Sequence, residues 1–413
     1  MRQVLLLSRS PGELWAALVE SDGLVALRLW RTGSQGQPGE IVLGRVRAMR
    51  PELPAALIDI GLERPGFLSG EDAEPRGDLN LHEGQSVIVQ VTKEARADKA
   101  TGLSMRLQRR GTRLDETERR AIAEAAARPG PVPRLLEAPA SVLELALDAF
   151  AAAAPEEIVI DDAAALGEAR RWVAHHAPSL SERLVLHRGR MPLFEDRGLG
   201  EEIAGALIPR VALEGGGALI IEHTAAATLI DVDSGVGDGR RDARASALAT
   251  NLAAATTVAR QVRLRSLAGP IVIDFIGMRH REDRHKVERA LAAALSEDRD
   301  SEVLGWTRLG HLELVRKRRH APLSELLFER VANGGWRRTS LTIALDALRA
   351  TAAEAAAAPS GRALRLRVSH EIAAVLMARA RSAWLELESR LGRPIEVVAD
   401  PALDREAIDI GSP

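Results

Sequence analysis

Two apolar stretches of the chain end in carboxylates. The first, ATLIDVDSG, spans Ala227 to Gly235 and contains Asp231 and Asp233, whereas the second, GPIVIDFIGM, begins at Gly269 and contains Asp274. Side chains two residues apart on a strand share a face, so Asp231 and Asp233 are expected to point the same way. A matched set of acids at the ends of apolar strands needs a physical cause.

The segment between the two acidic strands predicts how they meet. A helix is expected from about Arg244 to Leu267, with an apolar stripe at Leu248, Leu252, Ala255, Ala259 and Val262. A strand, a helix and a second strand form a β-α-β unit, whose crossover brings parallel strands into one sheet. The acids at the carboxyl ends of these strands are therefore expected to lie at one edge.

Carboxylates that meet at such an edge need a counter-charge. Two of them about 4 Å apart repel by about 4 kcal/mol at an effective dielectric constant near 20. A shared proton or a divalent cation would relieve the repulsion, and ligands without His or Cys favour Mg²⁺ or Mn²⁺ over zinc. The alternative is that these acids cap helices or close turns, as most aspartates at strand ends do.

Two competing interpretations of this region are weaker. The glycine-rich GVGDGR, Gly235 to Arg240, imitates a dinucleotide fingerprint, but Asp231 and Asp233 would then confront a pyrophosphate, so we interpret it as a turn. His280, His285 and His311 invite a zinc or general-base role. That role is not favoured, because the chain has no cysteine and a bound metal ion can itself activate water.

Composition excludes several classes of protein. The chain has 413 residues, of which 46% are hydrophobic, so several domains are expected. No apolar run approaches a membrane span, which predicts a soluble, cytoplasmic protein. The absence of cysteine excludes disulfides and thiolate zinc sites. A net charge of −2 means that any nucleic-acid binding must come from local patches.

The pattern of short strands and helices predicts a multidomain α/β protein. Gln3 to Trp30 reads as a few strands, and Ile41 to Leu107 as short strands separated by Pro and Gly turns, which indicates a small barrel. A charged helix is expected over Arg109 to Arg128, before the stiff PGPVP. An α/β layer follows, then the segment with the acidic strands, and Leu323 to Pro413 reads as a smaller α/β unit.

The acidic strands also carry a family resemblance. GGALIIEHTAAATLIDVDSG, followed by NLAAATTVARQVRLRSLAGPIVIDFIGM and later by EDRDSEVLGWTRLGHLELVRKRR, resembles the catalytic core of the ribonuclease E/G family. The resemblance implies a magnesium-dependent endoribonuclease that cleaves single-stranded, A/U-rich RNA in rRNA processing or mRNA decay and leaves a 5′-phosphate and a 3′-hydroxyl. The alternative is an RNA-binding protein with a weak or inactive nuclease site.

The resemblance also implies domain boundaries. It predicts a split ribonuclease H-like subdomain over 1–35 and 131–208, with an S1-type OB-fold RNA-binding domain inserted over 36–108. A charged helix and linker would occupy 109–130. A DNase I-like nuclease domain is expected over 209–322, and a small C-terminal α/β domain over 323–413.

Within the nuclease segment, the resemblance assigns the metal. Asp231 and Asp274 are the expected catalytic, metal-binding pair, and Asp233, where the family usually has asparagine, joins them as a metal ligand. Gly277 stands where the family often carries another acid, and Ala225 replaces a frequent glutamate, which favours the alternative of a weak site. Mg²⁺ is the expected cofactor, Mn²⁺ is the substitute, and no zinc is expected.

Residues expected to hold RNA lie in both halves of the chain. In the barrel, Phe67 would stack a base, although Leu57 and Ile60 stand where relatives often have aromatics. Basic side chains beside the barrel and the nuclease segment would grip or steer phosphates, while their alternative is solvated surface charge. The predicted basic RNA-binding residues are Lys93, Arg96, Lys99, Arg263, Arg265, Arg316, Lys317 and Arg318.

Several features of the family are not found in the sequence. Only the charged helix and PGPVP stand where relatives have a 5′-sensing pocket, so a 5′-monophosphate preference is expected to be reduced or absent. FERVANGGW replaces the paired-cysteine zinc link, so any homodimer would form without that link. No degradosome scaffold tail is expected, and single-stranded RNA is the expected partner, with no membrane.

Overall fold

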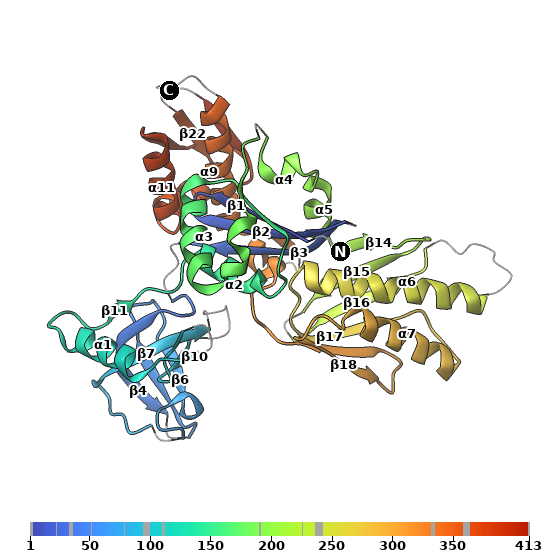
Figure 1. Ribbon diagram of the computed structural model, residues 1–413, viewed down its shortest axis with the longest axis horizontal. Helices are drawn as coiled ribbons and strands as arrows, with labels where there is room; N and C mark the ends of the chain where they lie inside the picture. Colours follow the sequence, from blue (N-terminus) through green and yellow to red (C-terminus); the bar gives the residue numbers. More distant parts are fainter. Residues whose placement is uncertain are drawn as a thin grey trace. The chain divides into compact units, whose positions relative to one another are not determined.

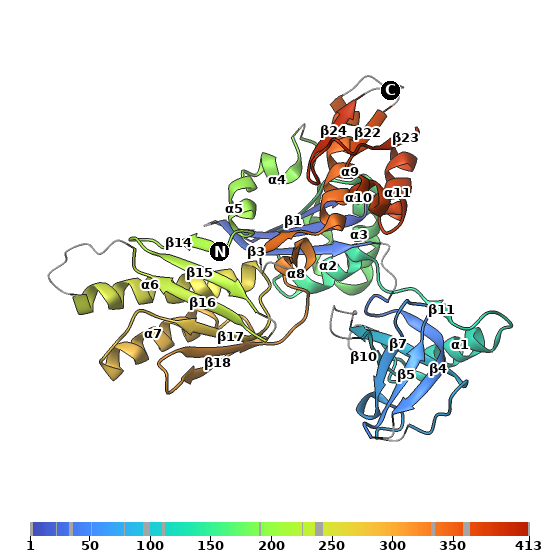
Figure 2. The same cartoon turned by 180° about the vertical axis from the view of Figure 1, so that it is seen from behind.

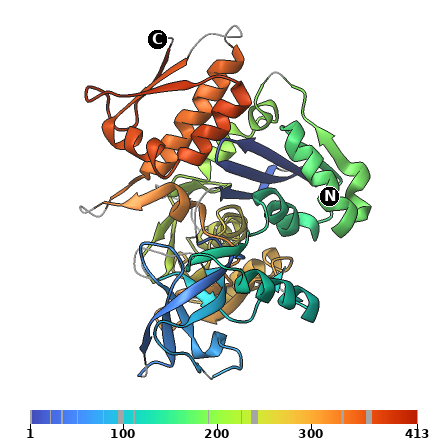
Figure 3. The ribbon, with the colours of Figure 1, turned by 90° about the vertical axis from the view of Figure 1, so that its left-hand side faces the viewer.

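The computed structural model describes most of the chain, in two compact units. The described residues are 3–21, 23–32, 36–50, 52–77, 79–93, 100–109, 112–189, 191–224, 226–235, 243–331, 335–357 and 364–411. One unit combines Met1–Thr32 with Val142–Pro413, and the other is Gly33–Ser141 (Figures 1 to 3). Of the sequence predictions, Arg96, Lys99, Ala225 and most of GVGDGR lie outside the described residues.

The unit Gly33–Ser141 contains a closed five-stranded barrel of OB-like form, as the short strands predict. Its strand order is β4-β5-β6-β8-β7, and pairing of β4 with β7 closes it. Alternate side chains point inward to a shared apolar core, which is the arrangement that period-two strands produce. The strands are β4 (Ile41–Arg50), β5 (Ala55–Asp59), β6 (Gly66–Ser69), β7 (Ser86–Lys93) and β8 (Gly102–Ser104).

The charged helix and the strand after it belong with the barrel. Helix α1 (Glu116–Ala127) is shorter than predicted and begins at Asp115, whose side chain accepts from the Glu118 amide in a capping box. Strand β11 (Arg134–Glu137) pairs antiparallel with β4. The sequence places 131–141 in the split α/β subdomain, but backbone pairing places β11 on the barrel instead.

The amino-terminal sheet has the order β13-β12-β1-β2-β3. Neighbours β1, β2 and β3 are antiparallel, whereas β12 and β13 run parallel to β1. Helices α2 (Val142–Ala151) and α3 (Ala163–His176) cover one face through a continuous apolar cluster. The strands are β1 (Val4–Ser10), β2 (Glu13–Glu20), β3 (Gly23–Arg31), β12 (Glu157–Ile160) and β13 (Leu184–Leu186), and α4 (Leu193–Asp196) and α5 (Gly200–Gly205) follow.

The acidic strands lie in the centre of a second sheet. Its order is β14-β15-β16-β17-β19-β18, and helices α6 (Ala243–Leu264) and α7 (Arg281–Ala294) pack on one face (Figure 1). Strands β16 and β17 are parallel and joined through α6, so the predicted β-α-β unit is confirmed. The strands are β14 (Arg210–Ala212), β15 (Ala218–His223), β16 (Thr228–Asp233), β17 (Gly269–Asp274), β18 (Ser301–Trp306) and β19 (Leu312–Arg316).

The last part of the chain is a small α/β domain. Strands β22 (Leu364–Val368), β23 (Ile395–Ala399) and β24 (Ile408–Gly411) form a sheet packed on α9 (Ser340–Ala357), α10 (His370–Met377) and α11 (Arg381–Leu391). Helix α8 (Leu323–Leu327) and a hairpin of β20 (Phe328–Arg330) and β21 (Trp336–Arg338) precede it. No helix among the described residues has the length and apolarity to cross a membrane.

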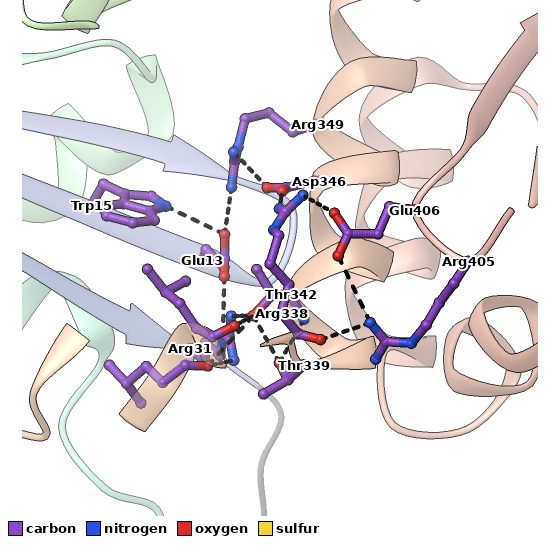
Figure 4. A network of polar contacts seen from close by, with 12 residues as sticks. Glu13, Trp15, Arg31, Arg338, Thr339, Thr342, Asp346, Arg349, Arg405 and Glu406 are labelled. Carbon is purple, nitrogen blue, oxygen red and sulfur yellow. Dashed lines mark hydrogen bonds and ion pairs between the residues drawn. The ribbon is translucent and has the colours of Figure 1, made fainter. Parts of the chain in front are cut away.

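A buried ion-pair network joins this C-terminal domain to the amino-terminal sheet (Figure 4). Glu13 on β2 is only 2% exposed and binds two guanidinium groups, those of Arg31 at 2.9 Å and Arg349 at 2.6 Å. Arg31 also donates to the Leu326 carbonyl and to the Thr342 hydroxyl. A buried charge is tolerated when it is paired and hydrogen-bonded, so these contacts depend on one another.

We expect Glu13→Ala to lower the free energy of unfolding by about 3–5 kcal/mol, because it leaves buried Arg31 without its counter-charge. Urea denaturation would measure the change. The matched control is Glu396→Ala, which breaks an exposed Arg–Glu pair with Arg365 and should cost less than about 1 kcal/mol. Equal losses in the two variants would contradict a buried network.

Candidate active site at the carboxyl ends of β16 and β17

Asp231 and Asp274 lie directly opposite each other on adjacent strands. The parallel register pairs Thr228 with Ile271 and continues to Asp231 with Asp274. Paired residues of neighbouring strands are about 4.8 Å apart and point to the same face of the sheet. Their neighbours Ile230 and Ile273 are buried under the two helices, so the acids face the opposite, exposed side.

The two carboxylates border a shallow hollow at this edge of the sheet. It has a volume of about 430 Å³ and is lined by both strand ends and by the residues that follow them. The Asp274 side chain is 60% exposed, so solvent reaches it freely. The lining residues are Asp231, Val232, Asp233, Ser234, Asp274, Phe275, Ile276 and Gly277.

Asp233 has its own partners. One of its carboxylate oxygens accepts from the Gly235 amide at 2.9 Å, and the other lies 3.4 Å from the Arg210 guanidinium on β14. The Gly235 hydrogen bond, followed by Arg210, lowers the pKa of Asp233 below its ordinary value. The charge that this residue adds is therefore balanced locally, by an arginine that the sequence did not single out.

The donor atoms at the edge suit a hard cation. Asp231 and Asp274 offer exposed carboxylate oxygens in register, and Mg²⁺ is commonly held by one or two carboxylates while it keeps several waters. Among the described residues, no group of three or more His, Asp or Glu side chains converges in a way that could hold a metal ion. The assignment of Asp233 as a third ligand, and metal binding itself, stay predictions.

His311 is a neighbour of this pair that sequence reasoning set aside. Its Nε2 lies 3.7 Å from a carboxylate oxygen of Asp274. Strand β19 is antiparallel to β17 and pairs Leu312 with Ile273, so the next residue outward, His311, falls beside Asp274. The proximity of His311 to Asp274 follows only from the pairing of these strands, because no local sequence pattern around this histidine indicates it. His285, by contrast, lies 3.7 Å from Glu288 and contacts Arg281 on its own helix.

Two arginines expected to grip RNA lie at the end of α6. Arg265 is 5% exposed, donates to the Gln261 side chain at 2.7 Å and to the Gly205 carbonyl at 3.3 Å, and has a pKa lowered by burial to about 10. Its buried guanidinium is thus hydrogen-bonded to the last residue of α5 and cannot contact a phosphate in this arrangement. Arg263 is half-buried, and its Nε is enclosed without a hydrogen-bond partner among the described residues.

The basic run that follows β19 lies at the end of the sheet away from the two acids. Arg316 pairs with Gly269 at the start of β17, whereas Asp274 ends that strand, so roughly 16 Å of strand separates them. Arg316 is buried, with Asp298 2.7 Å away, and Arg318 pairs with Glu325. Only Lys317 of the three is an exposed charge without such a pair in the described structure, and an RNA-binding role for the run stays a prediction.

Phe67 lies on the outer surface of the barrel. It is 38% exposed, so the alternative of a core aromatic is excluded. Strand pairing places Leu57, Phe67, Gly102 and Lys93 in one row across β5, β6, β8 and β7. Lys93 is exposed and Leu57 half-buried, whereas Ile60 is buried and cannot serve as a stacking position. The predicted aromatic and a predicted lysine thus share one face.

The fold and this edge define a multidomain α/β protein with an OB-like barrel and a pair of acids on parallel strands. The sequence pattern of the ribonuclease E/G family matches residues 81–319, more than half of the chain. Ribonuclease G of Haemophilus influenzae is 32% identical over 78% of this chain and 81% of its own length. Ribonuclease G of Escherichia coli K12 is 26% identical over 99% of both chains, and ribonuclease E of that strain is 28% identical over 94% of this chain and 44% of its own. The chain belongs to the ribonuclease E/G family.

We expect Arg210→Ala to raise the pKa of Asp233 only part of the way to its ordinary value, because the Gly235 amide, the larger cause, remains. Carbon-detected NMR titration of the aspartate carboxyls would measure this. A depressed carboxyl pKa stabilises the fold at neutral pH, and the contribution is lost as the pH falls through the folded-state pKa, so the variant should also lose less stability in acid. An unchanged Asp233 pKa would contradict the pairing of Arg210 with Asp233. The control is Arg47→Ala, which removes the partner of Asp59 in the barrel and should leave the Asp233 pKa unchanged.

Proposed function

We propose that this chain is a magnesium-dependent endoribonuclease that cleaves single-stranded, A/U-rich RNA. The observation that carries the proposal is the register of Asp231 opposite Asp274 at the edge of an exposed sheet face. Membership of a family whose relatives are named ribonuclease G and ribonuclease E supports RNA as the substrate. We place the activity in the cytoplasm, in rRNA processing or mRNA decay.

In the proposed mechanism, the carboxylates of Asp231 and Asp274 would hold the cation. Bound Mg²⁺ would supply an activated water and offset the charge that develops on the phosphoryl oxygens. The hollow beside the two acids leaves room for a phosphodiester to approach. The Arg210 guanidinium lies 3.4 Å from the Asp233 carboxylate, and its charge offsets part of the repulsion that this extra carboxylate would exert on the phosphate.

The barrel would hold the single strand. OB-folds bind single strands through aromatic stacking and a basic groove, and each stack contributes about 1–3 kcal/mol. Phe67 and Lys93 share one row on the outer face and provide one element of each kind. With Leu57 beside Phe67, we expect one stacked base and otherwise contacts to the backbone, so that binding depends little on base identity. Any homodimer would form without a zinc link, through the C-terminal domain.

A second candidate is an RNA-binding protein with an idle nuclease site. Two features favour it: no three-ligand cluster among the described residues, and Gly277, which contributes no carboxylate to the hollow. The two candidates predict the same binding but differ in cleavage.

Asp231→Asn and Asp274→Asn should each reduce cleavage at least about 100-fold, because loss of a ligand removes several kcal/mol of transition-state stabilisation. The assay follows a labelled A/U-rich RNA with Mg²⁺ or with chelator, and fluorescence anisotropy should show RNA binding retained. Glu313→Gln is the matched control, since Glu313 is an exposed acid on the adjacent strand, opposite Val272. If the unaltered protein binds RNA but cleaves none with Mg²⁺ or Mn²⁺, the second candidate stands.

Phe67→Ala should weaken binding of single-stranded RNA about 5- to 150-fold, which corresponds to the loss of one stacked base at about 1–3 kcal/mol. Anisotropy titration at fixed salt would measure it. Leu135→Ala serves as the control, because Leu135 is an exposed apolar side chain of the same unit on β11, away from the Phe67 row. The same affinity in both variants would remove Phe67 from the binding face.

A further inference from the structure

A fully buried asparagine on α6 holds the segment that follows Asp274. Asn251 has no exposed surface, and its side-chain amide makes two hydrogen bonds to one residue of the next loop. Its Nδ2 donates to the Ile276 carbonyl at 2.8 Å, and its Oδ1 accepts from the Ile276 amide at 3.0 Å. The amide thus replaces the neighbouring strand that Ile276 lacks after β17 ends.

Ile276 is the second residue after Asp274 and lines the same hollow. Phe275, the residue between Asp274 and Ile276, is buried, and its ring centroid lies 5.9 Å from that of Trp306 on β18. The Met278 carbonyl accepts from Arg284 on α7 at 2.9 Å. The chain that leaves Asp274 is therefore held by β18 at Phe275, by α6 at Ile276 and by α7 at Met278, and Asn251 supplies both hydrogen bonds at Ile276.

The chemistry of this contact is demanding. The N–H and the C=O of Ile276 belong to two successive peptide groups, and one side chain can satisfy both only if it carries a donor and an acceptor side by side. Aspartate keeps the acceptor but loses the donor when it is ionised, and leucine has the shape but neither function. A satisfied buried polar group of this kind specifies one arrangement of the backbone.

We propose that Asn251 is a positioning residue for the metal site. By holding the backbone N–H and C=O of Ile276, it fixes where β17 ends and so keeps Asp274 opposite Asp231 at the edge of the sheet. This inference rests on the proposed function of the two acids. Mg²⁺ and Mn²⁺ demand ligand oxygens at well-defined distances, so a ligand whose supporting backbone is released binds the cation more weakly.

The test compares variants of the full chain for Mn²⁺ binding without RNA, by isothermal calorimetry and by the Mn²⁺ electron paramagnetic resonance signal. Asn251→Leu should weaken Mn²⁺ binding about 10- to 100-fold, the range typical of residues that support a metal ligand. Asn251→Asp, nearly isosteric and milder, should weaken it in the same direction and serves if the leucine variant does not fold. With Mn²⁺ below saturation, kcat for RNA cleavage should fall in proportion while KM for RNA stays within about twofold, as expected when only the metal site is loosened.

The control is Gln261→Met, a buried amide on the same helix whose oxygen accepts from Arg265 rather than from the loop. It should lower the melting temperature without changing Mn²⁺ affinity, which separates positioning from general loss of stability. Unchanged Mn²⁺ affinity in both Asn251 variants, or an equal loss in the Gln261 variant, overturns the inference. If the unaltered protein binds Mn²⁺ but cleaves no RNA, the nuclease proposal fails, while the calorimetry still decides the role of Asn251. If the unaltered protein binds no Mn²⁺, the nuclease proposal and the positioning role of Asn251 both fail.

Discussion

The parallel pairing of β16 with β17 is the constraint on which the rest of the site depends. Its register sets Asp231 opposite Asp274, and a shift by one residue would turn one acid into the apolar layer under α6 and α7. The register is held because Ile230 and Ile273 are buried in that layer. Burial of apolar side chains on one face of the sheet thereby determines where the carboxylates lie on the other face.

Carboxylates placed this close together repel each other, and neighbouring groups offset part of that repulsion. Arg210 and the Gly235 amide stabilise the charge on Asp233, and His311 stands beside Asp274. What remains is a pair of acids with open coordination, facing solvent on the side of the sheet away from the helices. Such an environment suits the hydrated divalent cation that we propose for this site.

Arginine has mainly an architectural role in the unit that carries the site. Arg31, Arg265 and Arg316 are each buried or nearly so and donate to carbonyls or carboxylates that join separate elements. A planar guanidinium with five donors suits such junctions better than a lysine. Of the predicted RNA-binding residues, Arg265 and Arg316 are therefore not available to a polyanion, whereas Lys317 and, in the barrel, Phe67 and Lys93 remain exposed.

The sequence by itself determined the elements whose signals are local: the apolar acid-tipped strands, the helix between them, the parallel crossover and the barrel of short strands. The family resemblance could also be recognised from the sequence. The placement of Asp231 and Asp274 at one edge followed as well, because strand periodicity and crossover handedness fix the face and edge that they occupy. Only the tertiary structure decided that Arg265 is buried, that His311 adjoins Asp274, and that Asn251 holds Ile276, 25 residues away. Those facts depend on contacts between segments distant in the chain, and no local pattern encodes which polar side chain a fold will enclose.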